Sequence, residues 1–166
     1  MPKTRQQKAD TIERLTKEFK AAKAVVFADY QGLTVAKADE LRRRMRESDV
    51  TYVVAKKSLI TRAAKDAGYE IDAKAFPGML GVAFGAADEV APAKVLGDMA
   101  ALDAPIKLVG GVFEGAVVPA EKVVALSKLP SKKQLLGQLV GTIAAPMSAF
   151  VRALDAIKVS MEKVPA

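Results

Sequence analysis

Short apolar runs alternate with amphipathic segments over residues 1–128, and this alternation constrains the fold more than any other feature of the chain. Four runs are rich in Val, Ile, Phe and Ala, as buried strands are; they span residues 24–29, 51–54, 79–84 and 106–112. In the other segments apolar residues recur at steps of three and four, which is typical of helices; these segments span residues 5–22, 34–45, 58–68, 88–102 and 123–126. The pattern predicts an α/β fold: an α+β sandwich of ferredoxin-like character, with about four strands and flanking helices.

Individual residues mark the ends of several predicted elements. Thr34 and Ser58 carry hydroxyls that can cap helix N-termini, and Gly68 suits the left-handed stop of a helix. Pro92 is tolerated only in a first turn, so the helix around it should begin at about the residue before it. Gly81 lies inside an apolar run and indicates a weak point or the close approach of another group.

The chain changes character after Pro130. Ser131 starts a helical segment that Pro146 should interrupt, so we expect a domain over residues 1–128, a linking helix over 129–145 and an amphipathic helix over 146–166. The last segment places apolar residues on one face of a helix; they are Met147, Phe150, Val151, Leu154, Ile157 and Met161. Because no later element can pack on this stripe, it predicts a binding site for other protein chains.

Two other interpretations of the stripe are open. The tail could fold back over the front domain, although a hinge at Pro146 argues against this. A helix on a membrane surface normally carries many basic residues, whereas residues 147–166 have three basic and two acidic ones. No unbroken apolar run approaches the roughly 20 residues of a membrane span, and the charged N-terminus lacks the apolar core of a signal peptide. We therefore expect no membrane partner.

The net charge of +7 is concentrated at the front of the chain. Residues 1–65 carry 16 basic and 8 acidic residues (+8), and residues 66–166 carry 10 and 11 (−1). Such asymmetry indicates a polyanionic partner at one end, although a solvated basic surface would look the same.

Basic side chains in the first 65 residues form two groups that could bind a polyanion. Lys56 and Lys57 fall between a strand end and a helix N-terminus, where free backbone N–H groups favour a phosphate. The candidate residues for this contact, which the family resemblance described below assigns to RNA, are Lys3, Arg5, Lys8, Arg42, Arg43, Arg46, Lys56, Lys57, Ser58 and Arg62. The competing interpretation is that the arginines pair with Glu40, Glu47 and Asp49 on their own helix.

The residue types that are missing argue against catalysis. The chain has no Cys and no His, which removes disulfides, thiolate chemistry, the commonest general base and the commonest transition-metal ligand. The glycines match no nucleotide-binding fingerprint, and the carboxylates have no ligand spacing. We therefore expect no enzymatic activity, no cofactor and no metal, and the absence of Cys is compatible with a cytoplasmic protein.

Several segments together resemble one known family. They are residues 24–35 (AVVFADYQGLTV), 41–43 (LRR), 54–59 (VAKKSL), 62–63 (RA), 129–136 (LPSKKQLL) and 145–146 (AP). In the same order from end to end, they are similar to the bacterial large-subunit ribosomal stalk-base protein family, ribosomal protein L-ten. Where the family often has Lys-Asn-Thr, this chain has Lys56-Lys57-Ser58, which replaces an amide with a charge.

The resemblance implies a structural protein of the large ribosomal subunit. Its N-terminal domain would bind ribosomal RNA beside a neighbouring stalk-base protein of the L-eleven type. Its last helix would bind dimers of the small acidic stalk proteins (L-seven/L-twelve type), which recruit translational GTPases. In many bacteria the family also binds a leader on its own messenger RNA and so regulates its own translation. The alternative from the residues alone is a small α/β ligand-binding or enzymatic domain with a dimerising C-terminal helix.

Overall fold

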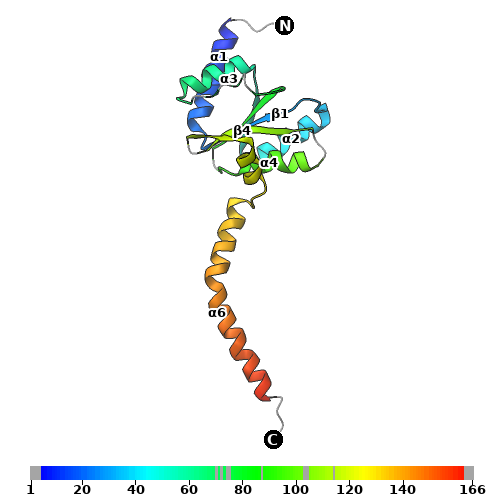
Figure 1. Ribbon diagram of the computed structural model, residues 1–166, viewed down its shortest axis with the longest axis vertical. Coiled ribbons are helices and arrows are strands. Elements are labelled where there is room, and N and C mark those ends of the chain that lie inside the picture. The colour runs from blue at the N-terminus through cyan, green and yellow to red at the C-terminus, as the bar shows by residue number, and fades with distance from the viewer. Residues whose placement is uncertain are drawn as a thin grey trace. The chain divides into compact units, whose positions relative to one another are not determined.

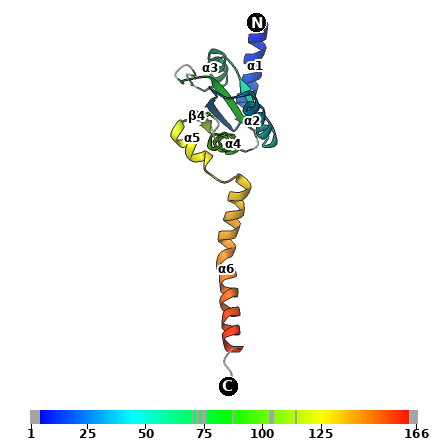
Figure 2. The same cartoon turned by 90° about the vertical axis from the view of Figure 1, so that its right-hand side faces the viewer.

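A computed structural model describes residues 5–69, 71, 73, 76–86, 88–102, 105–113 and 115–162, except the side chains of residues 5 and 159–162. The chain divides into two compact units, Met1–Leu129 and Pro130–Ala166. Each unit is described by itself (Figures 1 and 2).

The front unit is built on one sheet of five strands in the order β2-β3-β1-β4-β5, and every neighbouring pair is antiparallel. Its elements in chain order are α1 (Arg5–Ala21), β1 (Ala24–Asp29), α2 (Val35–Glu47), β2 (Val50–Val54), α3 (Lys57–Asp66), β3 (Leu80–Gly85), α4 (Ala91–Ala101), β4 (Lys107–Phe113), β5 (Ala116–Pro119) and α5 (Ala120–Ser127). Strand β3 lies between β1 and β2, and β1 lies between β3 and β4. The connection from β1 through α2 to β2 and the connection from β3 through α4 to β4 therefore each form a split βαβ unit, with one strand between the two that are joined. The predicted α+β sandwich of ferredoxin-like character is confirmed.

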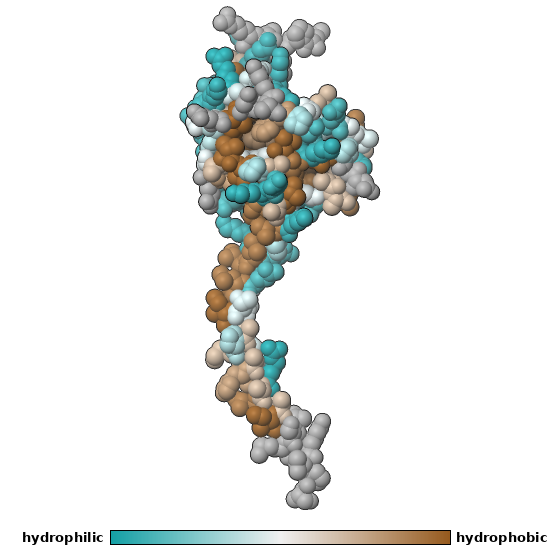
Figure 3. All heavy atoms as spheres, in the orientation of Figure 1, coloured by the Kyte–Doolittle hydropathy of each residue, from teal (hydrophilic) through white to brown (hydrophobic). Residues whose placement is uncertain are grey.

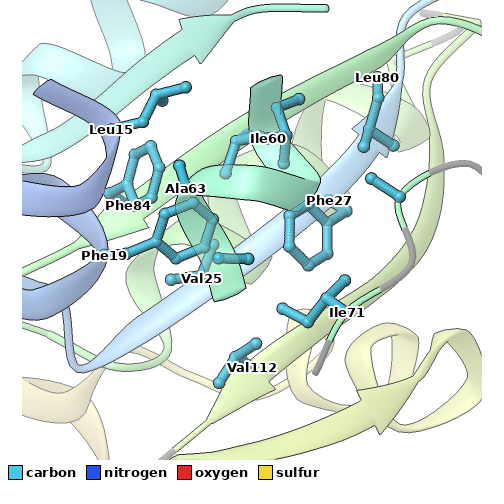
Figure 4. Packing of buried hydrophobic residues seen from close by; sticks show 13 residues of the cluster. Leu15, Phe19, Val25, Phe27, Ile60, Ala63, Ile71, Leu80, Phe84 and Val112 are labelled. Carbon is cyan, nitrogen blue, oxygen red and sulfur yellow. The ribbon is translucent and has the colours of Figure 1, made fainter. Parts of the chain in front are cut away.

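Helices cover both faces of the sheet. On one face, α1 and α3 pack with alternate strand residues. Figure 4 shows this cluster, which is Leu15, Phe19, Val25, Phe27, Ile60, Ala63, Ala64, Ile71, Ala73, Leu80, Val82, Phe84 and Val112. On the other face, α2, α4 and α5 pack with the intervening residues, which are Val26, Ala28, Leu41, Met45, Val50, Ala83, Ala93, Leu96, Met99, Ile106 and Val123. The apolar run of β1 is thus buried on both sides, as a continuous rather than alternating pattern predicts.

The four predicted strands are present, and β5 is an additional one. It pairs with β4 through a tight turn at Gly115, whose φ of +84° favours glycine. β5 has four residues, mostly exposed, and ends in a proline, so it lacks the buried pattern that reveals a strand. In the sequence, β5 is indicated only by Gly115, which lies in a short gap between two apolar runs.

The predicted helix ends of the front unit are confirmed at three positions and wrong at one. Helix α4 begins at Ala91, the residue before Pro92, as expected. The Thr34 hydroxyl accepts from the Lys37 N–H and caps α2. Gly68, at φ +94°, ends α3 in a Schellman motif, in which the N–H of Tyr69 donates to the Ala64 carbonyl.

Ser58 does not cap α3, which corrects the prediction. Lys56 is the N-cap residue, its backbone is extended, and its carbonyl accepts from the N–H groups of Leu59 and Ile60. Ser58 therefore lies inside the first turn, two residues after the cap. No side chain caps this helix, so a search for a capping hydroxyl selects the wrong residue.

The second unit is one long helix, α6 (Lys132–Glu162). Ser131 and Gln134 form a capping box: the Gln134 side chain accepts from the Ser131 N–H at 3.0 Å, and the Ser131 hydroxyl accepts from the Gln134 N–H at 3.4 Å. Pro146 lies inside the helix, so the predicted interruption is wrong. A proline removes one backbone hydrogen bond and bends a helix, and 31 residues supply enough remaining bonds to continue past it.

Replacing Gly81 with Ala should destabilise the front unit, because the added Cβ would run into the ring and hydroxyl of Tyr52 on the neighbouring strand. We expect a loss of about 1–3 kcal/mol in the free energy of unfolding, as for other overpacked sites. Urea unfolding of Gly81→Ala alone and combined with Tyr52→Ala measures the coupling between the two sites. Equal losses in both backgrounds would show that the Tyr52 side chain is not the obstacle.

Candidate nucleic-acid and partner-binding surfaces

A cleft of about 840 Å³ lies between α1 and α3, here called the α1–α3 cleft. Its lining residues are Lys8, Ala9, Ile12, Glu13, Thr16, Lys17, Lys20, Ser58, Leu59, Arg62 and Asp66. The structure thereby brings together three sequence-predicted RNA-binding residues from distant parts of the chain: Lys8, Ser58 and Arg62. Four basic side chains face two carboxylates in the cleft, which leaves an excess of positive charge.

Among the described residues, one exposed ion pair lies inside the α1–α3 cleft. Lys17 donates to Glu13 at 2.8 Å, and this hydrogen bond and charge lower the pKa of Glu13 and raise that of Lys17. Lys8, Lys20 and Arg62 form no ion pair within the described part of the chain. These three cations are therefore free to meet an anion from outside.

The two lysines at the start of α3 differ in their surroundings. Lys56 is exposed at the helix N-terminus, as a phosphate ligand would need to be. Lys57 is only partly exposed, and its ammonium group donates to the carbonyl oxygen of Phe76 at 2.5 Å. The sequence places both on a phosphate, but the geometry gives Lys57 a structural partner that the local sequence could not reveal.

The arginine run on α2 pairs largely with its own helix, as the competing interpretation proposed. Arg42 donates to Asp39 at 2.8 Å, Arg44 donates to Glu40 at 2.6 Å, and Arg43 lies 3.6 Å from Glu47. Asp49, the third carboxylate expected to pair with the arginines, forms none of these pairs, and Asp39 takes its place. The chain has already left the helix at Asp49, which has a φ of +53°. Arg46 forms no ion pair with any residue that the structure describes.

A second basic hollow, of about 430 Å³, contains Arg42 and Arg46 and is here called the arginine cleft. Its lining residues are Arg14, Arg42, Met45, Arg46, Asp49, Val50, Thr51 and Tyr52. Arg14 comes from α1 and was not among the predicted residues, since its approach to α2 depends on the tertiary fold. Burial raises the pKa of Tyr52 to about 12, so its phenol adds no negative charge to the cleft at neutral pH.

Two candidates at the N-terminus cannot be placed in either cleft. Lys3 lies outside the described residues, and Arg5 begins α1 but its side chain lies outside them.

The apolar stripe of α6 is exposed. Met147 is 72 % exposed, Phe150 63 % and Ile157 55 %, and Val151 and Leu154 are also exposed. Met161 lies in α6, but its side chain is outside the described ones. Figure 3 shows apolar side chains along α6 on both sides of the middle of the helix.

The exposed stripe also begins earlier than the sequence interpretation placed it. Leu136, Leu139, Val140 and Ile143 precede Pro146 and are more than half exposed. The expected break at Pro146 caused their omission, because it assigned them to a linking helix. Their spacing continues the stripe through the whole of α6.

Helix α6 is also long and apolar enough, over Lys132–Lys158, to cross a membrane by length and composition alone. The sequence analysis expected no segment of this length that is apolar enough to span a membrane. Residues 134–151 nevertheless contain no charged side chain. The strict apolar run is broken by Gln134, Gln138 and Thr142, which is why a search for unbroken runs missed it. A helix that binds partner chains passes the same test, since it needs the same apolar surface.

Comparisons with known proteins cover both units. The profile of the family "Ribosomal protein L10" matches residues 3–101, and that of "Ribosomal protein uL10 C-terminal region" matches residues 129–162. A relative named large ribosomal subunit protein uL10 in Clostridium tetani is 40 % identical over 160 residues, covering 96 % of this chain and 93 % of that protein. Proteins of the same name in Natranaerobius thermophilus and Pelotomaculum thermopropionicum are 40 % and 42 % identical, covering 95 % and 93 % of this chain and 89 % and 88 % of their own lengths.

Exchanging Lys57 for Met should separate a structural role from a binding role. Met keeps the apolar stem but cannot donate to the Phe76 carbonyl, so we expect about 1 kcal/mol lower stability to unfolding and faster amide exchange over residues 76–79. The matched variant Lys56→Met removes the same charge from an exposed side chain and should leave both quantities unchanged. A Lys57→Met protein of full stability would contradict the structural assignment.

Proposed function

The chain belongs to the ribosomal protein uL10 family, and from this premise we propose that it forms the base of the ribosomal stalk. Membership makes it a structural protein of the large ribosomal subunit, at work in the cytoplasm, and not an enzyme. In the proposal, the front unit binds large-subunit ribosomal RNA, and α6 anchors dimers of acidic stalk proteins of the L-seven/L-twelve type, which recruit translation factors.

The observation that carries the protein-binding half is the unbroken exposed stripe on α6. A single helix with this much apolar surface gains stability only when the surface is covered. Residues 132–166 carry five basic and two acidic residues, a net charge of +3. An acidic partner with its own apolar helix would therefore match the stripe in both shape and charge.

The RNA-binding half rests on the α1–α3 cleft and the exposed Lys56. Lys8, Lys20 and Arg62 face this cleft and form no ion pair within the described ranges. Arginine and lysine side chains that converge in this way bind phosphate oxygens strongly and with little dependence on base sequence. Contact with a neighbouring stalk-base protein of the L-eleven type, and regulation of the chain's own messenger RNA, belong to the same proposal.

Removing two charges from the α1–α3 cleft should weaken RNA binding and make it less dependent on salt. For Lys8→Gln with Arg62→Gln we expect the slope of log affinity against log salt to flatten by about 0.7–0.9 for each lost phosphate contact. Binding of the full chain to large-subunit ribosomal RNA, titrated between roughly 50 and 200 mM salt, measures this slope. Lys107→Gln with Lys122→Gln removes the same charge from exposed positions outside both clefts and should keep the slope; equal slopes in both double variants would contradict the assignment.

A charge on the apolar stripe should abolish the complex with acidic stalk proteins while RNA binding survives. Phe150→Asp puts a carboxylate in the middle of the stripe, where covering it would bury an unpaired charge. Ser148→Asp adds the same charge on the opposite face of the same turn and should leave the complex intact. Size-exclusion chromatography with light scattering reads out both variants.

The same chromatography of the chain alone distinguishes the main alternative. A homodimer that Phe150→Asp converts to a monomer, with no stalk-protein complex in the wild type, would favour a self-associating helix instead. Loss of RNA binding together with the protein complex would indicate that α6 belongs to the folded core.

A further inference from the structure

The arginine cleft lies at the free edge of the sheet, and none of its described lining residues belongs to α3. Strand β2 is the outermost strand on its side and pairs only with β3. Helices α1 and α2 pack on opposite faces of the sheet. Arg14 therefore reaches the edge of β2 from one face, and Arg42 and Arg46 reach it from the other.

The charge in this cleft is poorly compensated. Arg42 is bound to Asp39, but neither Arg14 nor Arg46 forms an ion pair in the portion of the chain that the structure describes. Asp49 is the one carboxylate among the described lining residues, so the guanidinium groups of Arg14 and Arg46 share a single negative charge in the cleft. Two unpaired guanidinium groups held in the same hollow favour an anion from outside the chain.

The chemistry of the lining fits a phosphate group. A guanidinium presents a planar fork of N–H donors that matches two phosphate oxygens. An edge strand adds outward-facing backbone N–H groups, because one side of its hydrogen-bonding capacity is unused. Asp49 directly follows the C-cap residue Ser48 of α2, and its left-handed conformation ends that helix beside the cleft.

Helix α1 separates this cleft from the α1–α3 cleft. Consecutive residues diverge, with Glu13 lining one cleft and Arg14 the other. A helix with its side chains is about 10–12 Å across, so ligands bound on its two flanks would lie roughly that far apart.

We propose that the arginine cleft binds a phosphate of RNA, so that two phosphate-bearing strands lie on either side of α1. The cleft is a second contact, formed by Arg14, Arg42 and Arg46, on the flank of α1 opposite the first. This inference rests on the proposed RNA-binding function, and it extends the footprint to the free edge of β2.

Substituting the two unpaired arginines tests the proposal in the full chain. With large-subunit ribosomal RNA as the probe, Arg14→Gln with Arg46→Gln should flatten the salt slope by about 0.7–0.9 per phosphate contact. The control Lys107→Gln with Lys122→Gln should keep the wild-type slope. Arg14→Lys with Arg46→Lys keeps both charges but loses the planar fork, so we expect a near-normal slope with weaker binding.

The outcomes separate this inference from the function on which it rests. A slope that stays at the control value in the glutamine variant, while Lys8→Gln with Arg62→Gln flattens it, overturns the arginine cleft and leaves the proposed function standing. No affinity of the wild type for the RNA overturns both.

If the glutamine variant does not fold, the wild type can be titrated with inorganic pyrophosphate while the NMR signals of the arginine Nε–H groups are followed. Saturable shifts at Arg14 and Arg46 but not at Arg43 support the cleft. The absence of such shifts overturns it.

Discussion

The burial of β1 on both faces is the constraint on which the front unit depends. Because Val25 and Phe27 point to one helical layer and Val26 and Ala28 to the other, a single six-residue strand holds both cores together. Phe19 of α1 packs edge-on against Phe84 of β3, with ring centroids 4.9 Å apart, and so fixes α1 against one face. With α1 and α2 held on opposite faces, one basic cleft forms between α1 and α3, and the other forms where Arg14 of α1 approaches Arg42 and Arg46 of α2.

Polar contacts add to the packing at one end of the sheet. The Asp29 carboxylate accepts from the N–H groups of Met79 at 2.8 Å and Gln31 at 3.1 Å. Gly78, at φ +69°, leaves no room for a Cβ because that carboxylate lies against it. With the bond from Lys57 to the Phe76 carbonyl, these contacts tie the start of α3 to the entry of β3. The position of the exposed Lys56 therefore depends on these neighbouring contacts.

Local patterns predicted most of the fold and only part of the candidate sites. The strands, the cap at Thr34 and the stop at Gly68 depend on neighbouring residues, so the sequence reveals them directly. Arg14 escaped prediction because its place beside Arg46 depends on the strand order, which no local pattern encodes. The misassignment of Ser58 and the omission of β5 have the same origin: a helix can begin without a side-chain cap, and an edge strand needs no buried alternation.

At Pro146, the rule that a proline ends a helix and the spacing of the apolar residues lead to different predictions. A proline in a helix interior costs roughly 3 kcal/mol, and the sequence rule accordingly ends the helix there. The stripe nevertheless keeps its register across the proline, since Ile143, Met147 and Phe150 follow at steps of four and three and are all exposed. A partner that covers both halves of this stripe would gain apolar burial on each side of Pro146, which can offset the lost hydrogen bond. In the proposed complex, a partner that packs along the whole stripe would therefore stabilise α6 as one continuous helix.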